Sequence, residues 1–183
     1  MALVPPSSRA GGLSFIAEVS LAAPALTMDF PGIPQGFRHL QLVVYARCDQ
    51  AAVQQDQLYL QMNGDGGANY SWQTCEGFDA SAIGNAAIAD NSGIRVGELP
   101  AAAALANAFG LTVIDVPYYT TTVAFKSVIS HGQNARLGTA AVLDQKLCGG
   151  WWASTAAITR LTLSMFNADN FITGSIASLY GIA

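Results

Sequence analysis

In the stretch HLQLVVYAR, His39 to Arg47, apolar residues recur with a period of two. In an extended chain Leu40, Leu42, Val44 and Ala46 fall on one face, and the residues between them fall on the other. A helix would scatter these four side chains around its circumference. The stretch therefore predicts a β-strand with one buried face, in a chain whose other segments repeat the pattern.

Period-two alternation recurs along the chain, each time between Gly, Pro, Asn or Asp residues. This spacing of short strands and turns is typical of a β-sandwich or barrel. With His39 to Arg47, the predicted strands are Leu13 to Leu21, Gln57 to Met62, Gly93 to Leu99, Phe109 to Val116, Thr122 to Ser130, Lys146 to Ser154, Ile158 to Phe166 and Phe171 to Ile182. We expect an all-β fold, a jelly-roll-like β-sandwich of about eight or nine strands.

The last predicted strand, in FITGSIASLYGIA at residues 171 to 183, has apolar residues on both faces. A strand with one wet face would alternate between apolar and polar residues. We therefore expect this strand to have the core beneath it and another element or subunit above it.

Three segments lack the strand pattern. Pro100 to Gly110, PAAAALANAFG, has a proline and a glycine where a short helix would begin and end, so we expect a helix there. Asp79 to Ser92 is rich in Ala, Asn and Ser and is expected to be a long loop. Met1 to Gly12, with Pro5-Pro6 and Gly11-Gly12, is expected to be an extended N-terminal arm before a single domain at residues 13 to 183.

The surface is expected to carry few charges. Asp, Glu, Lys and Arg make up 11% of the 183 residues, apolar residues 51%, and the mean hydropathy is +0.33, whereas an average soluble domain is roughly 25% charged. No uninterrupted apolar run approaches the roughly 20 residues of a membrane span. We therefore expect a homo-oligomer, most simply a trimer, that buries surface against its own copies, with no membrane partner.

The distribution of the charged residues argues against a nucleic acid partner. The formal net charge is −4, and the eight basic residues are scattered without a basic patch, so no nucleic acid partner is expected. The N-terminal sequence lacks the basic start and apolar block of a secretory signal. Cys48, Cys75 and Cys148 are odd in number and widely spaced, so we interpret them as small buried apolar residues.

No catalytic motif is present. His39 and His131 are the only two histidines, and each has a simple structural position, one at a strand start and one in a turn. In the loop NGDGGANY, Asn63 to Tyr70, side-chain oxygens could face Ca²⁺, but position 74 is Thr where a calcium hand needs a bidentate Glu. A glycine-rich turn explains the same residues. We expect no enzyme activity, no metal and no cofactor.

Aromatic residues are the best candidates for a binding site. Trp151 and Trp152 are consecutive, so on a strand one enters the core and the other points away from it. An outward Trp can anchor a subunit interface or stack on a sugar ring. The candidate residues for an interface or a glycan site are Trp72, Tyr118, Tyr119, Trp151 and Trp152.

Four stretches carry a family resemblance: GFRHLQLVVYAR, LQMNGDGGANYS, GGWWASTAAITRLTL and NFITGSIASLYGI. Together, over about Phe37 to Ile182, they resemble a group of small structural proteins of tailed bacteriophages with a C-terminal Ser-Leu-Tyr-Gly-Ile strand. The resemblance implies a virion protein assembled in the bacterial cytoplasm, most simply an oligomeric capsid decoration or cement protein that contacts the major capsid protein. The alternative is a tail, baseplate or fibre module that contacts tail components and binds a host surface glycan. The resemblance implies no catalytic residues.

Overall fold

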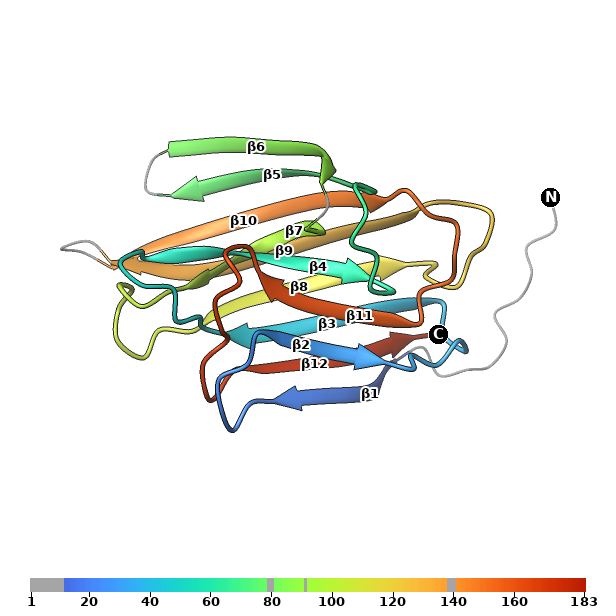
Figure 1. Cartoon of the computed structure of the whole chain (residues 1–183), viewed down its shortest axis with the longest axis horizontal. Coiled ribbons are helices and arrows are strands. Elements are labelled where there is room, and N and C mark those ends of the chain that lie inside the picture. Colours follow the sequence, from blue (N-terminus) through green and yellow to red (C-terminus); the bar gives the residue numbers. More distant parts are fainter. Residues whose placement is uncertain (1–11, 79–80, 91, 138–140) are drawn as a thin grey trace.

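The computed structural model describes residues 12–78, 81–90, 92–137 and 141–183. These residues form two antiparallel sheets packed face to face, with no helix among them (Figure 1). The expected β-sandwich is confirmed, with twelve strands in place of eight or nine. They are β1 (Leu13–Ser20), β2 (Thr27–Pro31), β3 (His39–Ala46), β4 (Gln55–Met62), β5 (Tyr70–Phe78), β6 (Ser81–Asp90), β7 (Ile94–Pro100), β8 (Gly110–Pro117), β9 (Lys126–Leu137), β10 (Ala141–Trp152), β11 (Arg160–Met165) and β12 (Ile176–Ile182).

The two sheets differ in width. The large sheet has eight strands in the order β1-β12-β3-β8-β9-β10-β5-β6, and the small sheet has four in the order β2-β11-β4-β7. The pairs β3–β8, β4–β7 and β5–β6 are nested in sequence and alternate between the two sheets. This nesting is consistent with the jelly-roll-like winding expected from the sequence.

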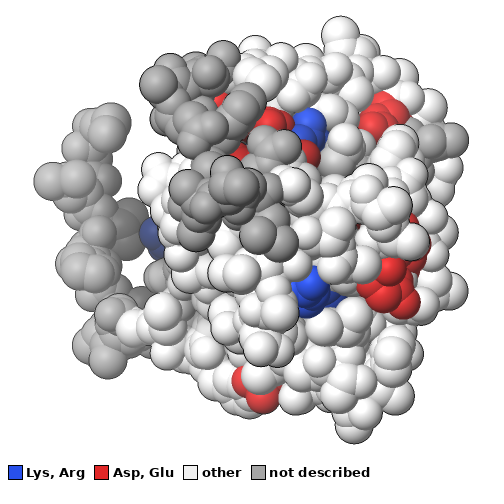
Figure 2. Space-filling model, turned by 90° about the vertical axis from the view of Figure 1, so that its left-hand side faces the viewer, with Lys and Arg blue, Asp and Glu red and all other residues white. Residues whose placement is uncertain are grey.

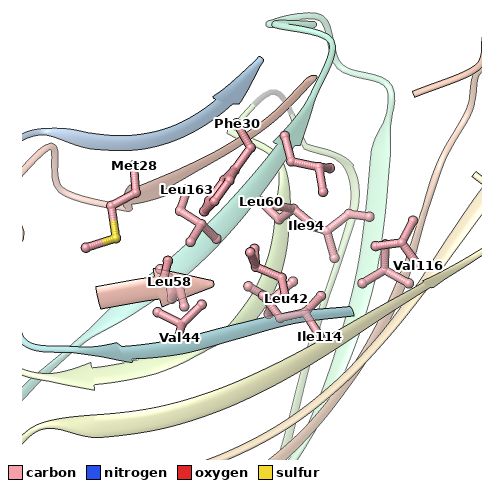
Figure 3. Close-up of a cluster of buried hydrophobic side chains, with 14 of the residues drawn as sticks. Met28, Phe30, Leu42, Val44, Leu58, Leu60, Ile94, Ile114, Val116 and Leu163 are labelled. Atoms are coloured by element: carbon pink, nitrogen blue, oxygen red, sulfur yellow. The ribbon is translucent and has the colours of Figure 1, made fainter. Parts of the chain in front are cut away.

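The hydrophobic core lies between the two sheets. Leu42 and Val44 of β3 point toward Leu58 and Leu60 of β4, as the alternation in both segments predicts (Figure 3). All four side chains are buried. The labelled core residues around them are Met28, Phe30, Ile94, Ile114, Val116 and Leu163.

The closing strand lies in the interior of the large sheet, between β1 and β3. It begins at Ile176 and not at Phe171, which forms isolated bridges with Ala25 and Cys48. Leu179 faces the core and is buried. Tyr180 points to the other side and is half-buried beside Phe15 of β1, so the core expected beneath the strand is present and its outer side is open in the single chain.

The helix expected at Pro100 to Gly110 does not form. The segment makes two turns, in which the Ala104 and Ala108 amides donate to the carbonyls of Ala101 and Leu105, each at 3.0 Å. The buried guanidinium of Arg47 donates to five carbonyls of this segment, with the closest at Leu105 (2.6 Å). The others are those of Ala101, Ala102, Ala104 and Ala108. Because Arg47 satisfies these carbonyls, the segment does not need a helical hydrogen-bond ladder.

The loop expected at Asp79 to Ser92 is also wrong, because Ser81–Asp90 form strand β6 against β5. Its Ala, Gly, Asn and Ser residues have low intrinsic strand preference, so the pairing with β5 decides its conformation. Strands β2 and β5 were not predicted. In β5 the inward positions Thr74 and Glu76 are polar yet buried, which hides the usual alternation. Residues 1–11 of the expected arm lie outside the described residues.

Replacing Arg47 by Lys should destabilise the fold. A lysine ammonium has three donors on a flexible stem and cannot reach five carbonyls arranged around a planar guanidinium. We expect a loss of about 2 to 4 kcal/mol in the free energy of unfolding, measured by urea denaturation. The exposed Arg38→Lys is the matched control and should change little. Equal stability of both variants would contradict the role of Arg47.

Candidate functional site

The most unusual surface is the face of the large sheet that points away from the small sheet, here called the outer face. Strand register sets which residues share it: Val43 pairs with Val113, Val113 with His131, and His131 with Leu147, which pairs with Cys75. These five side chains form one row across β3, β8, β9, β10 and β5. The row joins strands that are far apart in sequence.

Large apolar side chains on the outer face are open to solvent. Leu147 is 52% exposed and Trp151 is 54% exposed. By the same register, Leu13, Phe15, Tyr45, Leu111, Ile129 and Leu143 also lie on this face and are exposed. Scattered exposed apolar residues are normal on a soluble protein, but a contiguous group of this kind marks an interaction surface.

Charged groups on this face are few. Along β8, β9, β10 and β5, the outward described residues include one charged side chain, Asp115, which accepts a hydrogen bond from Gln41 at 2.9 Å. Half of the eight basic residues of the chain are buried, namely Arg47, Arg95, Lys126 and Lys146. Figure 2 shows one end of the molecule, where charged side chains form a few separate spots on an otherwise uncharged surface.

Two open grooves indent the outer face. The first, of about 530 Å³, lies between Leu111 and Val113 on one side and Cys75 and Leu147 on the other, with His131 in its lining. The second, of about 440 Å³, is lined by Ser71, Trp72, Gln73, Ala86, Ala87, Ile88, Gly149, Gly150 and Trp151. Gly149 of β10, which pairs with the outward Ile129, places no side chain on the surface beside the Trp151 strand position.

The two consecutive tryptophans point to opposite faces, which confirms the expectation from the sequence. Trp152 is buried and stacks on Tyr70, with a ring centroid separation of 6.4 Å. Its Nε1 donates to Asp65 Oδ2 at 2.6 Å. Trp151 lies on the outer face at the second groove.

The other three candidate aromatics do not join Trp151 in one cluster of exposed rings. Trp72 lines the second groove, but its ring packs toward the core, and its Nε1 donates to Asp90 Oδ2 at 2.8 Å. Tyr119 is buried, and its hydroxyl donates to the Pro34 carbonyl. Tyr118 is exposed and packs edge-on to His39. Of the five candidates, Trp151 is the one whose ring is exposed on the outer face.

Alanine substitutions should separate the roles of the two tryptophans. Trp152→Ala empties a buried site and should lower the free energy of unfolding by about 3 to 5 kcal/mol. Trp151→Ala should leave that energy within about 0.5 kcal/mol of the original and weaken self-association by about 2 kcal/mol. Thermal unfolding and analytical ultracentrifugation measure the two effects, and the same response from both variants would contradict this assignment.

Behind the outer face, five charged side chains form a buried ion cluster at the edge of the small sheet. Lys146 Nζ lies 2.8 Å from Glu76 Oε2, 2.8 Å from Glu98 Oε2 and 3.1 Å from Asp144 Oδ2. The Arg95 guanidinium pairs with Glu76 at 2.6 Å and also with Glu98. Strands β5, β7 and β10 thus contribute to one network, which binds the two sheets together through charge and not through apolar packing.

The ion pairs and burial act in opposite directions on these groups. Burial opposes the charge of Lys146, but Glu98 and Glu76 outweigh it, so the pKa of Lys146 is raised. Burial likewise opposes the charge of Glu76, but Lys146 and Arg95 hold its pKa below the usual value. For Glu98, burial prevails over the same two cations and raises its pKa.

Lys146→Met should destabilise the protein in a pH-dependent way. At pH 7 the variant leaves buried carboxylates short of a cation, so we expect a loss of about 3 to 5 kcal/mol. The lowered pKa of Glu76 means that its stabilising contribution exists above pH 4.5 and disappears as the pH falls through its folded-state pKa. The difference between the original protein and the variant should therefore shrink only below pH 4.5, so that it is smaller at about pH 3 than at pH 7.

Urea denaturation at the two pH values measures this effect. The control is Arg160→Met, which removes an exposed pair with Asp29 of 2.7 Å and should matter little at either pH. A constant difference between Lys146→Met and the original protein at both pH values would show that the carboxylates do not cause the loss.

The loop at Asn63 to Tyr70 is a turn, as the sequence favoured. Asn63 has a φ of 54° and Gly64 a φ of 69°, the left-handed pair typical of a type I′ turn, and the turn carries the chain from β4 in the small sheet to β5 in the large sheet. Asp65 accepts hydrogen bonds from the Gly67 amide (2.8 Å), Asn69 Nδ2 (2.9 Å) and the Trp152 indole. The indole and the amide lower the pKa of Asp65. Its carboxylate therefore faces N–H donors and ties the turn to β10.

The histidines and cysteines are dispersed. His39 Nδ1 accepts from the Tyr118 amide at 3.2 Å, and His131 lies on the outer face. Cys48 and Cys148 are buried, and burial raises the pKa of each thiol to about 11. Cys75 is exposed, which corrects the expectation that all three cysteines are buried. Its outward position on β5 explains the difference.

The described ranges contain no candidate metal site. No three His, Cys, Asp or Glu side chains there are grouped to hold a metal ion. Within the same residues no helix is long and apolar enough to cross a membrane. The chain matches no protein-family model, no curated protein and no solved structure.

Proposed function

We propose that this protein is a non-enzymatic structural protein of a tailed bacteriophage virion, an oligomeric decoration or cement protein on the capsid exterior. The observation that carries the proposal is the exposed, apolar and nearly uncharged outer face of the large sheet. The family resemblance of the sequence supports the placement on a phage particle. The partners are copies of the chain itself and the major capsid protein.

The size of the outer face suits a stable subunit contact. Eight strands at about 4.8 Å spacing, each at least about 23 Å long, span roughly 900 Å². A standard protein interface covers about 800 Å² on each partner. When two such surfaces meet, the exposed apolar side chains of one can enter the two grooves of the other.

A second candidate function rests on Trp151. Its exposed ring borders the second groove beside Ser71 and Gln73, whose polar groups could bond sugar hydroxyls while the ring stacks on the sugar. In that case the protein is a tail, baseplate or fibre module that binds a host surface glycan. One exposed ring among uncharged apolar neighbours favours the interface, because glycan platforms depend on polar groups around the ring.

Cryo-EM of the phage that carries this protein tests the proposal. We expect its density at symmetry-related positions on the outside of the head. Density confined to the tail tip would overturn the capsid assignment in favour of the glycan-binding module. Absence from the particle would overturn both assignments.

A substitution on the outer face tests self-association directly. Leu147→Glu places a charge in the middle of the apolar row and should lower the subunit number seen by light scattering, with unchanged thermal stability. Val123→Glu is the matched control, because Val123 is 88% exposed but lies in the turn between β8 and β9. If both variants assemble as the original protein does, the outer face is not the contact between copies.

A further inference from the structure

The four sheet edges of the described fold differ in their protection. Strand edges carry free N–H and C=O groups, and monomeric proteins block them with charges, proline, bulges or short strands. Edge strand β2 has five residues and ends at Pro31, β1 has a bulge between Phe15 and Ala17 and carries Glu18, and β7 is buried throughout. The fourth edge strand is β6.

Strand β6 has a bulge near its end, where the register shifts between Ala87 and Asp90 and Ala89 has a φ of 55°, but it has none of these features before Ala87. It is ten residues long and pairs on one side with β5. Residues 81 to 89 contain no charge and no proline, and the one charged residue, Asp90, is at the end. Ile83 is 44% exposed and Ile88 is 87% exposed, although both are large apolar residues.

We propose that β6 is a docking edge for the β6 strand of a second copy of this chain. The two strands pair antiparallel, as every strand pair in this fold does. The two large sheets then form one continuous sheet across the contact. The free backbone groups of β6 gain hydrogen bonds, and Ile83 and Ile88 gain apolar neighbours.

The lack of charge favours a second copy over other extended partners. An antiparallel pair of identical strands is related by a two-fold axis, so a residue near the axis lies opposite its own copy. A charged residue there would face a like charge. The central residues of β6 are Asn85 and Ala86, which are small and neutral.

This inference rests on the proposed self-association but makes a separate prediction about subunit number. A β6 pair is two-fold, so the particle in solution must have an even number of subunits. It is a dimer, or a hexamer if the three-fold contact expected from the sequence also forms. A trimer or a monomer would overturn the β6 contact, while the place of the protein on the virion is decided separately by cryo-EM.

Lysine substitutions on the two faces of β6 test the contact between the two β6 strands. By register with Gln73 and Glu76, Ala86 lies on the outer face and Ile83 on the opposite face. Ala86→Lys and Ile83→Lys should each weaken the two-fold contact at least tenfold in sedimentation equilibrium. The controls are Ala86→Gln and Ile83→Gln, which add similar length without charge. If packing through the outer face were the contact instead, Ile83→Lys would have no effect and the β6 proposal would be wrong.

Hydrogen exchange of the unmodified protein tests the same contact without relying on any variant. If β6 pairs with its copy, amide protons between Ile83 and Ile88 that point away from β5 should exchange more slowly as the protein concentration rises. Amides of edge strand β2, which lies in the small sheet and away from the outer face, serve as the internal control and should show no such change. Exchange in β6 that does not depend on concentration would overturn the proposal.

Discussion

The unequal width of the two sheets is the constraint from which the other features of this protein follow. Four strands at about 4.8 Å spacing cover only about half the width of eight. The small sheet reaches from β2, which packs on β1, to β7, which packs on β8, β9, β10 and β5. Beyond that edge, among the described residues, β6 has no strand of the small sheet above it and no strand on the side away from β5. The large sheet therefore extends past the small sheet and presents an uncovered edge at β6. Its outer face is open because the described sandwich has two layers.

The interior changes character where the small sheet ends. Between β3 and β4 it is apolar, but at β7 it contains Arg95 and Glu98, which meet Glu76 and Lys146 of the large sheet. Ions this deeply buried must be paired, because an isolated charge loses its hydration without compensation. The buried charge of Arg47 is stabilised by neutral partners, because its guanidinium donates to carbonyls of residues 101 to 108. The chain thus uses half of its few cations as internal connectors, and its surface is poorer in charge than its composition suggests.

The proposed outer-face contact and the proposed β6 contact both join one copy of the chain to another. The outer face offers apolar side chains, and the β6 edge offers free backbone groups, which are the two means by which β-sandwiches associate. They lie on different parts of the sheet and can act together, so a copy of the chain can contact one neighbour through its face and another through its edge. A protein that covers a particle needs more than one such contact.

The sequence by itself determined the features that depend on neighbouring residues. The alternation in His39 to Arg47 and Gln57 to Met62 predicted two core strands, Asn63-Gly64 a turn, and Trp151-Trp152 one ring on each face, because strand geometry alone sets these outcomes. The tertiary structure decided whatever depends on partners distant in sequence. It made a strand of Ser81–Asp90 by pairing it with β5, and it held residues 101 to 108 as turns through Arg47. It also brought Glu76, Arg95 and Lys146 into one cluster, which no local pattern could show, since hydrogen-bond and ion partners across a sandwich are chosen by register and not by spacing along the chain.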